Sequence, residues 1–169
     1  MTDDADHRPH APETLAILEK RKIEGEILKH VFETARASHG EKAARALIAE
    51  AVRRSAIQQG ERFAAAQPEG PSLEHFIETQ ELWTRGGALE IETIEKGPDV
   101  YAFNVTRCRY AETYRAMGLG EIGPLLSCQR DHVFCEGYDK RLKLTRTQTI
   151  MEGASHCDFR YRYVEEDKA

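Results

Sequence analysis

The chain has 169 residues and a mass of 19.2 kDa, which fits one globular domain with a sizeable core. Its 24 basic and 29 acidic residues give a net charge of −5, whereas a protein that binds a phosphate backbone normally has a basic excess. No apolar run approaches the roughly 18 residues of a membrane span, and residues 1–13 lack the apolar core of a secretory signal. We therefore expect a cytoplasmic protein without nucleic-acid or membrane partners, and a disordered tail over residues 1–13.

Residues 14–85 have the composition of a helical half. Apolar residues recur at helical spacing over 14–40 and 41–67, and Ser72 is a typical N-cap for a third helix over 72–83. The apolar positions of the first two helices are Leu15, Leu18, Ile23, Ile27, Val31 and Phe32, then Ala44, Leu47, Ile48, Ala51, Val52 and Phe63. We expect some of these positions to be exposed and to permit a homo-oligomer through the first two helices.

The period changes at Leu89, and residues 86–164 are expected to form the sheet-containing catalytic part. Alternating segments over 89–95 and 100–107 flank a turn and predict a hairpin. The remaining elements are two helices and two strands, expected over 107–117, 121–137, 141–150 and 155–164. The order β-β-α-α-β-β predicts an α+β fold, in which helices cover one face of a four-stranded, mainly antiparallel sheet. Residues 14–169 are expected to be one domain.

Strand alternation places Arg146 on the buried face of its strand, together with Leu142 and Leu144. An arginine there requires an anion, because an unpaired buried charge is strongly disfavoured. The anion is either the carboxylate of a ligand, which a guanidinium can hold through two parallel hydrogen bonds, or Glu112 or Asp131 in a structural ion pair. The sequence leaves both interpretations open.

Cys157 is expected on the same side of the sheet as Arg146. A nucleophilic cysteine needs a depressed pKa, which a neighbouring Arg146 could supply, whereas most buried cysteines are small inert core residues. The flanking His156 and Asp158 point to the opposite face, so a Cys-His-Asp triad would require a β-bulge.

Cys128, Asp131 and Cys135 share one stripe of the helix expected over 121–137. A carboxylate in an apolar site has a raised pKa and can act as a general base or acid. The alternatives are that Asp131 pairs with an arginine and that the thiols only pack. A similar stripe on the preceding helix is formed by Cys108, Glu112 and Arg115.

Metal and cofactor motifs are weak or missing. The chain has no Cys-x-x-Cys pair and no His-Glu-x-x-His motif, and Cys128 and Cys135 would lie roughly 10 Å apart along a helix. The segment from Gly118 to Glu121 is interpreted as a helix break and not as a phosphate-binding loop. We therefore expect neither a metal nor a cofactor.

The segment from Arg107 to Arg162 resembles the family named for L-2-amino-thiazoline-4-carboxylate hydrolase, and the likeness spans roughly residues 80–163. It is clearest at Cys108, Gly118-Leu119, Cys128, Asp131, Leu144-Thr145-Arg146-Thr147, Gly153 and Cys157-Asp158-Phe159. The resemblance implies a hydrolase that acts on a non-peptide C–N bond. It would open a cyclic amidine that carries a carboxylate, by adding water to C2 of the thiazoline and yielding a carbamoyl-cysteine.

The resemblance also implies roles for individual residues. Arg146 would hold the substrate carboxylate, and Asp131 or Glu112 would pair with the amidine. Either Cys157 attacks C2, or Asp131 activates a water for that attack. The full expected site is Cys157, Asp131, His156 and Asp158 as catalytic residues, and Arg146, Thr147, Glu112 and Cys128 as substrate-binding residues.

Two other functions remain open. One is a binding or sensor module that holds a small carboxylate without transforming it. The other is a thiol switch, which would form reversible disulfides among the four cysteines, Cys108, Cys128, Cys135 and Cys157.

Overall fold

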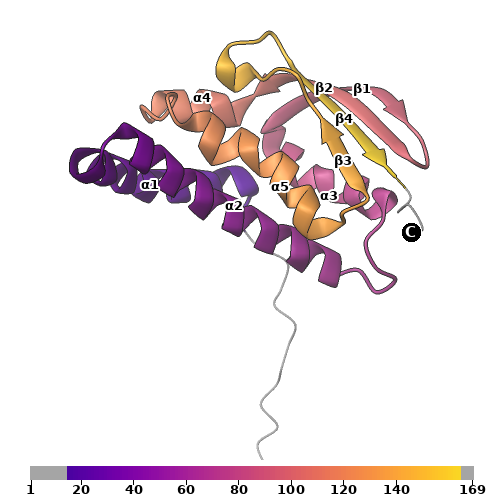
Figure 1. Ribbon diagram of the computed structural model, residues 1–169. Coiled ribbons are helices and arrows are strands. Elements are labelled where there is room, and N and C mark those ends of the chain that lie inside the picture. The colour runs from indigo at the N-terminus through magenta and orange to yellow at the C-terminus, as the bar shows by residue number, and fades with distance from the viewer. Residues whose placement is uncertain (1–14, 165–169) are drawn as a thin grey trace, which may run out of the picture.

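The computed structural model describes residues 15–164, so the tail expected over residues 1–13 lies outside the described residues. The fold is α+β, as the sequence predicts. A helical N-terminal half precedes a four-stranded antiparallel sheet, and helices pack on one face of that sheet (Figure 1).

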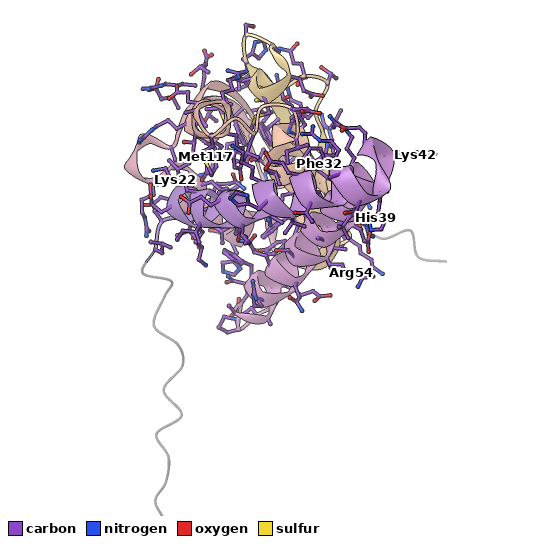
Figure 2. All side chains as sticks on the ribbon, turned by 90° about the vertical axis from the view of Figure 1, so that its left-hand side faces the viewer. Lys22, Phe32, His39, Lys42, Arg54 and Met117 are labelled. Atoms are coloured by element: carbon purple, nitrogen blue, oxygen red, sulfur yellow. The ribbon has the colours of Figure 1, made fainter. Side chains whose placement is uncertain are left out.

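Helix α1 (Ile17–His39) and helix α2 (Glu41–Ala65) meet at Gly40. Gly40 has a φ of 83°, which glycine adopts without steric cost. This junction lets α1 run across α2 at an angle (Figure 2). Helix α3 (Leu73–Thr84) begins as expected, because the Ser72 hydroxyl accepts a hydrogen bond of 3.2 Å from the His75 N–H.

Several apolar positions of α1 are exposed, as expected. Its buried residues are Ile17, Leu18, Arg21, Gly25, Phe32 and Ala35, whereas Leu15, Ile23, Ile27 and Val31 are exposed. The reason is Gly25, since a Cβ at this position would contact the side chains of Met117, Tyr114 and Leu119 at 3.2–3.3 Å. The helix turns its glycine-bearing stripe inward because only that stripe permits such close packing. The homo-oligomer expected through these helices stays a prediction.

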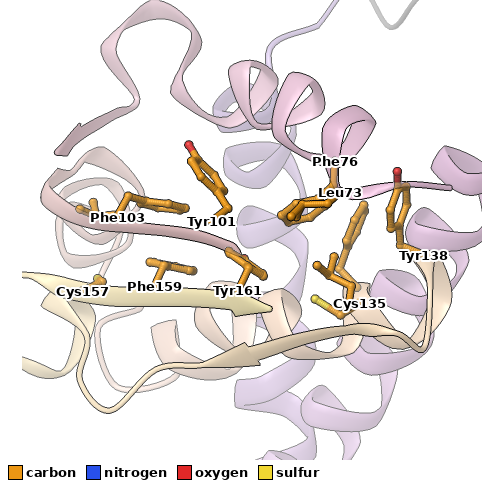
Figure 3. Close-up of a cluster of buried hydrophobic side chains, with 12 residues drawn as sticks. Leu73, Phe76, Tyr101, Phe103, Cys135, Tyr138, Cys157, Phe159 and Tyr161 are labelled. Atoms are coloured by element: carbon orange, nitrogen blue, oxygen red, sulfur yellow. The ribbon is translucent and has the colours of Figure 1, made fainter. Parts of the chain in front are cut away.

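The sheet contains β1 (Leu89–Lys96), β2 (Val100–Cys108), β3 (Leu142–Thr145) and β4 (Cys157–Tyr163), in the order β1-β2-β4-β3. Strands β2 and β4 form its centre, and their side chains on the helix-covered face lie in register. The pairs are Val105 with Cys157, Phe103 with Phe159 and Tyr101 with Tyr161. At one end of this row, the Tyr161 ring lies 4.7 Å from the ring of Phe76 on α3 (Figure 3).

Two helical segments follow the hairpin. Helix α4 (Arg109–Ala116) is followed by a π-helical turn, η2 (Pro124–Cys128), and helix α5 (Gln129–Tyr138). Together, η2 and α5 occupy the range in which one helix was expected. Helix α5 lies along α2, with Gly60 and Gly137 at their closest approach (Figure 1).

Strand β3 is shorter than the predicted segment 141–150, because the backbone of the next residues binds a side chain. The Asp158 carboxylate accepts hydrogen bonds from the N–H groups of Thr147, at 2.9 Å, and Gln148, at 3.0 Å. These groups are then not available to a strand ladder. A short 3-10 turn, η3 (Ile150–Glu152), completes the connection to β4, which begins at Cys157 and not at residue 155. Across residues 15–164, no helix is both long enough and apolar enough to cross a membrane.

Candidate functional site

A cavity lies between the covered face of the sheet and helices α1, α2, α3 and α5. Its volume is about 820 Å³, including solvent at the mouth. The walls are mainly aromatic, through Phe76, Trp83, Phe103, Phe134, Phe159 and Tyr161. Charged groups and thiols also reach it, namely Arg21, Arg130, Asp131, Arg146, Cys108, Cys128 and Cys157. A mostly apolar cavity with a few convergent polar groups is typical of a small-molecule site.

Arg146 extends from the end of β3 to α5 and forms an ion pair with Asp131. A second Nη group donates to the Cys128 carbonyl oxygen at 2.9 Å, and the guanidinium carbon lies 4.9 Å from the Phe159 ring centroid. The Arg146 side chain is only 7% exposed. Of the two interpretations of Arg146, a ligand carboxylate or a structural ion pair, the structure shows the ion pair with Asp131. A ligand carboxylate would have to displace Asp131 to reach Arg146.

Asp131 is one of the residues that line the cavity. Arg146 binds Oδ2, whereas within residues 15–164 no group donates a hydrogen bond to Oδ1. Burial raises the pKa of Asp131 above its usual value, and the charge of Arg146 opposes this rise. The Asp131 side chain keeps 28% of its accessible surface, so Asp131 is a partly buried carboxylate with a raised pKa.

Cys157 lines the same cavity, on the side where the sequence placed it. Its Sγ accepts a hydrogen bond of 3.2 Å from the Ile150 N–H. Burial raises the pKa of the Cys157 thiol, although this hydrogen bond and the charge of Arg146 act in the other direction. The depressed pKa that a resting thiolate nucleophile needs is thus absent from Cys157.

The other three cysteines of the described chain are also free thiols. Burial raises the pKa of Cys108 to about 11, and those of Cys128 and Cys135 to about 12. Cys108 and Cys128 line the cavity, whereas the Cys135 Sγ–H donates to the Asp131 carbonyl oxygen at 3.3 Å. High thiol pKa values disfavour rapid thiol–disulfide exchange, which weakens the thiol-switch interpretation.

Thr147 and Asp158 lie beside the cavity and not in its lining. The Thr147 hydroxyl donates to Asp158 Oδ2 at 2.6 Å, in addition to the two backbone hydrogen bonds to Oδ1. Burial raises the pKa of Asp158, but these hydrogen bonds outweigh burial and lower it. Asp158 therefore fixes the backbone of Thr147 and Gln148, the two residues that follow Arg146.

Glu112 and His156 do not meet the other expected site residues. Glu112 is exposed and pairs with Arg107 at 2.8 Å, so the predicted convergence of two carboxylates in one site is wrong. His156 points away from Cys157, since its Nδ1 contacts Ser155 Oγ at 2.9 Å and the Gln148 amide at 3.3 Å. In the described structure, β4 contains no bulge that would turn His156 or Asp158 toward Cys157.

Two buried arginines were missed by the sequence analysis. Arg21 on α1 and Arg130 on α5 both line the cavity and share the carboxylate of Glu24. Helical periodicity could have indicated that Arg21 is buried. Arg21 lies three residues after Leu18 and four before Gly25, and all three are on the buried stripe of α1. Arg130 occupies the same kind of position, four residues after Leu126.

The described residues hold neither a metal-binding cluster nor a nucleotide-binding glycine loop in its usual context. Over residues 15–164, no three His, Cys, Asp or Glu side chains are grouped to hold a metal ion. Residues 118–123 have the spacing Gly-x-Gly-x-x-Gly, but they follow α4 and lead into η2. The dinucleotide-binding pattern follows a strand and opens a helix, so this segment lacks its context.

Comparison with known proteins identifies a family. The sequence model described as L-2-amino-thiazoline-4-carboxylic acid hydrolase matches residues 20–161. No curated protein matches the chain. Among solved structures, the chain is similar to the crystal structure of the phenol-responsive sensory domain of the transcription activator PoxR with phenol. The identity is 15%, the TM-score is 0.49, and the match covers 85% of this chain and 74% of that one.

Proposed function

Because the chain belongs to the L-2-amino-thiazoline-4-carboxylic acid hydrolase family, we propose that it hydrolyses a small cyclic amidine that carries a carboxylate. Asp131 is the general base for the attacking water in this proposal. The observation that carries the proposal is the Asp131 carboxylate in the cavity lining, with Oδ2 bound by Arg146 and no hydrogen bond to Oδ1 from the residues of the range 15–164. Burial raises the pKa of Asp131 and so makes it a stronger base than an exposed aspartate.

The reaction begins with a protonated amidine. Asp131 accepts a proton from water while the water oxygen bonds to C2, and the electrons of the C2–N double bond move to the ring nitrogen. The C2–S bond then breaks, the sulfur takes the proton from Asp131, and the hydroxyl proton leaves to solvent as the carbonyl forms. The product is a carbamoyl-cysteine. The bond that breaks in this mechanism is C2–S, and both nitrogens stay on C2, so the mechanism differs from the hydrolysis of a non-peptide C–N bond that the resemblance implies.

Arg146 acts on Asp131 in this mechanism. Its guanidinium fixes the orientation of the carboxylate and limits the rise in the pKa of Asp131 that burial causes. Thr147 and Asp158 position the segment that carries Arg146, and the Cys128 carbonyl oxygen fixes its other Nη group. His156 and Glu112 have no role in this mechanism, because neither lines the cavity.

A covalent route through Cys157 is the alternative mechanism. The thiol lines the cavity, but burial raises its pKa, so a proton would first have to be removed. The water nucleophile also has to lose a proton, and Asp131 in the cavity lining can accept it. The hydrogen bond found at Cys157 Sγ comes from a donor, the Ile150 N–H, and not from a base, so we favour the water route.

The test uses the purified chain and L-2-amino-thiazoline-4-carboxylate, with products followed by mass spectrometry. We expect a product heavier by one water and a new free thiol. Asp131→Asn should lose this turnover, whereas Asp99→Asn, in the exposed turn between β1 and β2, should retain it. A parallel reaction with a chelator decides whether a metal is required. If Asp131→Asn retains full turnover, Asp131 is not the base.

A ligand-binding module is the second candidate function. The supporting observation is that Asp131 and Arg146 already neutralise each other in a largely aromatic cavity, which suits retention of a ligand as well as catalysis. This candidate predicts stoichiometric binding of the same carboxylate, detected by calorimetry, with no product after prolonged incubation.

A further inference from the structure

Two guanidinium groups besides that of Arg146 line the cavity. Arg21 projects from α1 and Arg130 from α5, and the two residues are 6% and 8% exposed. Charged side chains this deeply buried require compensation by anions or by a full set of hydrogen bonds.

Only one carboxylate compensates both arginines within residues 15–164. Arg21 Nη1 contacts both Glu24 oxygens, at 2.7 and 2.6 Å, and Arg130 Nη2 contacts Glu24 Oε2 at 3.0 Å. Glu24 itself is partly exposed, since its side chain retains 38% of its accessible surface. Two buried positive charges therefore share one half-solvated negative charge.

The remaining partners of the two arginines are neutral. Arg21 Nη2 donates to Gln59 Oε1 at 3.0 Å, while Arg130 donates from Nε to the Leu126 carbonyl oxygen at 2.8 Å and from Nη1 to Ser55 Oγ at 3.3 Å. A guanidinium has five N–H groups, so each arginine keeps donors that these contacts do not use. Burial, together with the charge of Arg21, lowers the pKa of Arg130 to about 10, as expected where positive charge is in excess.

We infer that Arg21 and Arg130 bind the carboxylate of the substrate, on the wall of the cavity beside Asp131. This inference rests on the proposed function, because it assigns a place to the anionic end of that substrate. Arg130 and Asp131 are consecutive residues of α5, and both line the cavity. The cavity lining thus contains two arginines that share one carboxylate and, on the same helix as Arg130, the carboxylate of Asp131, which matches a ligand with a carboxylate and a protonated amidine. Arg146 is a weaker candidate, because Asp131 and the Cys128 carbonyl oxygen already engage it.

The experiment compares L-2-amino-thiazoline-4-carboxylate with 2-amino-2-thiazoline, which has the same ring without the carboxylate. For each variant we would measure kcat/KM for both compounds and their binding by calorimetry. The variants are Arg21→Gln and Arg130→Gln, with Arg54→Gln as the matched control, because Arg54 is an exposed residue of α2 with one ion pair to Glu50.

We expect Arg21→Gln and Arg130→Gln each to reduce the preference for the carboxylate compound by about 10-fold or more, and Arg54→Gln to leave it unchanged. Glu24→Gln should increase the preference, because it removes the competing carboxylate and releases donors on both arginines. Glu24→Gln also keeps the test decisive if an arginine variant fails to fold, since an unchanged preference in Glu24→Gln overturns the inference.

The outcomes separate this inference from the proposed function. Hydrolysis with an unchanged preference in both arginine variants overturns the inference and leaves the hydrolase in place. Binding without hydrolysis, weakened in the arginine variants, supports the anion site and rejects the hydrolase. Neither binding nor hydrolysis of the carboxylate compound rejects both.

Discussion

The Arg146 guanidinium binds the Asp131 carboxylate through one Nη group and the Cys128 carbonyl oxygen through the other. One side chain from the end of β3 therefore engages both η2 and α5, which fixes the carboxylate against the cavity wall. The Phe159 ring beneath the guanidinium shields this pair from the sheet side. The proposed base is thus held by a neighbouring cation in an apolar setting, and its protonation depends on that cation.

The first prediction concerns the pH dependence of turnover. Burial raises the pKa of Asp131 while Arg146 opposes the rise, so activity should fall at acidic pH with an inflection above about 3.9, the ordinary aspartate value. Arg146→Gln removes the opposing charge and should move the inflection to higher pH. The measurement is kcat/KM against pH for the wild type and Arg146→Gln, with Arg54→Gln as the control. An inflection that does not move in Arg146→Gln would show that another group titrates.

The second prediction separates the two routes of attack. If Asp131 activates water, Cys157→Ser should retain at least about a tenth of the wild-type kcat, because the hydroxyl only replaces a thiol in the cavity wall. A covalent route requires the thiol, and Cys157→Ser would then be inactive. Cys135→Ser is the matched control, since Cys135 is buried outside the cavity lining. Intact-mass analysis during turnover adds a direct measurement, and an adduct on Cys157 would contradict the water route.

The third prediction concerns stability and the Asp158 carboxylate. Hydrogen bonds from Thr147 and Gln148 lower its pKa in the folded state, despite opposing burial. A carboxyl with a lowered folded pKa contributes stability above its unfolded pKa and loses it as the pH falls through the folded value. Asp158→Asn should reduce the free energy of unfolding at pH 7 by about 1 kcal/mol, and this difference should shrink below about pH 4.

Urea unfolding of wild type and Asp158→Asn at pH 7 and at pH 3 measures that difference. Asp99→Asn serves as the control, because its side chain is in an exposed turn. A difference that is equal at both pH values would mean that the charge of Asp158 does not contribute. Asp158→Asn should also lower kcat more than KM changes, because the segment that carries Arg146 loses its anchor.

The element types and a mainly antiparallel sheet were predictable from the sequence, but the order of the strands, the buried face of α1 and the end of β3 were not. Periodicity did not show which apolar positions of α1 are exposed, and the helix buries the stripe through Gly25. Hydrophobicity alone gives a glycine little weight, although its lack of a side chain permits the closest packing. The end of β3 was also not predictable, because it depends on a carboxylate eleven residues away, Asp158, which binds the Thr147 backbone.

The residues of the candidate site were likewise predictable only in part. Alternation placed Arg146 and Cys157 on one face of the sheet correctly, and helical spacing brought Asp131 to them. Glu112 was misplaced because residue spacing does not show how far a helix is rotated about its axis, and Arg107 holds Glu112 at the surface. Arg21 and Arg130 were missed because they come from helices more than 100 residues apart in sequence, and only the tertiary fold brings them to Glu24.

The last prediction concerns the close packing of helix α5 against helix α2 at Gly137. A Cβ on Gly137 would overlap the carbonyl oxygen of Ile57, which belongs to the backbone of α2 and cannot rotate away. Replacing glycine by alanine within a helix normally stabilises it by about 1 kcal/mol, but overpacking against backbone costs about 1–3 kcal/mol and more. We therefore expect Gly137→Ala to destabilise the protein by about 2 kcal/mol in urea unfolding.

Gly120→Ala is the control, because its Cβ would meet only the Arg115 side chain at 3.6 Å and should leave stability nearly unchanged. A Gly137→Ala variant as stable as Gly120→Ala would show that α2 and α5 can separate without cost, and the positions of Arg130 and Asp131 on α5 would then not depend on this contact.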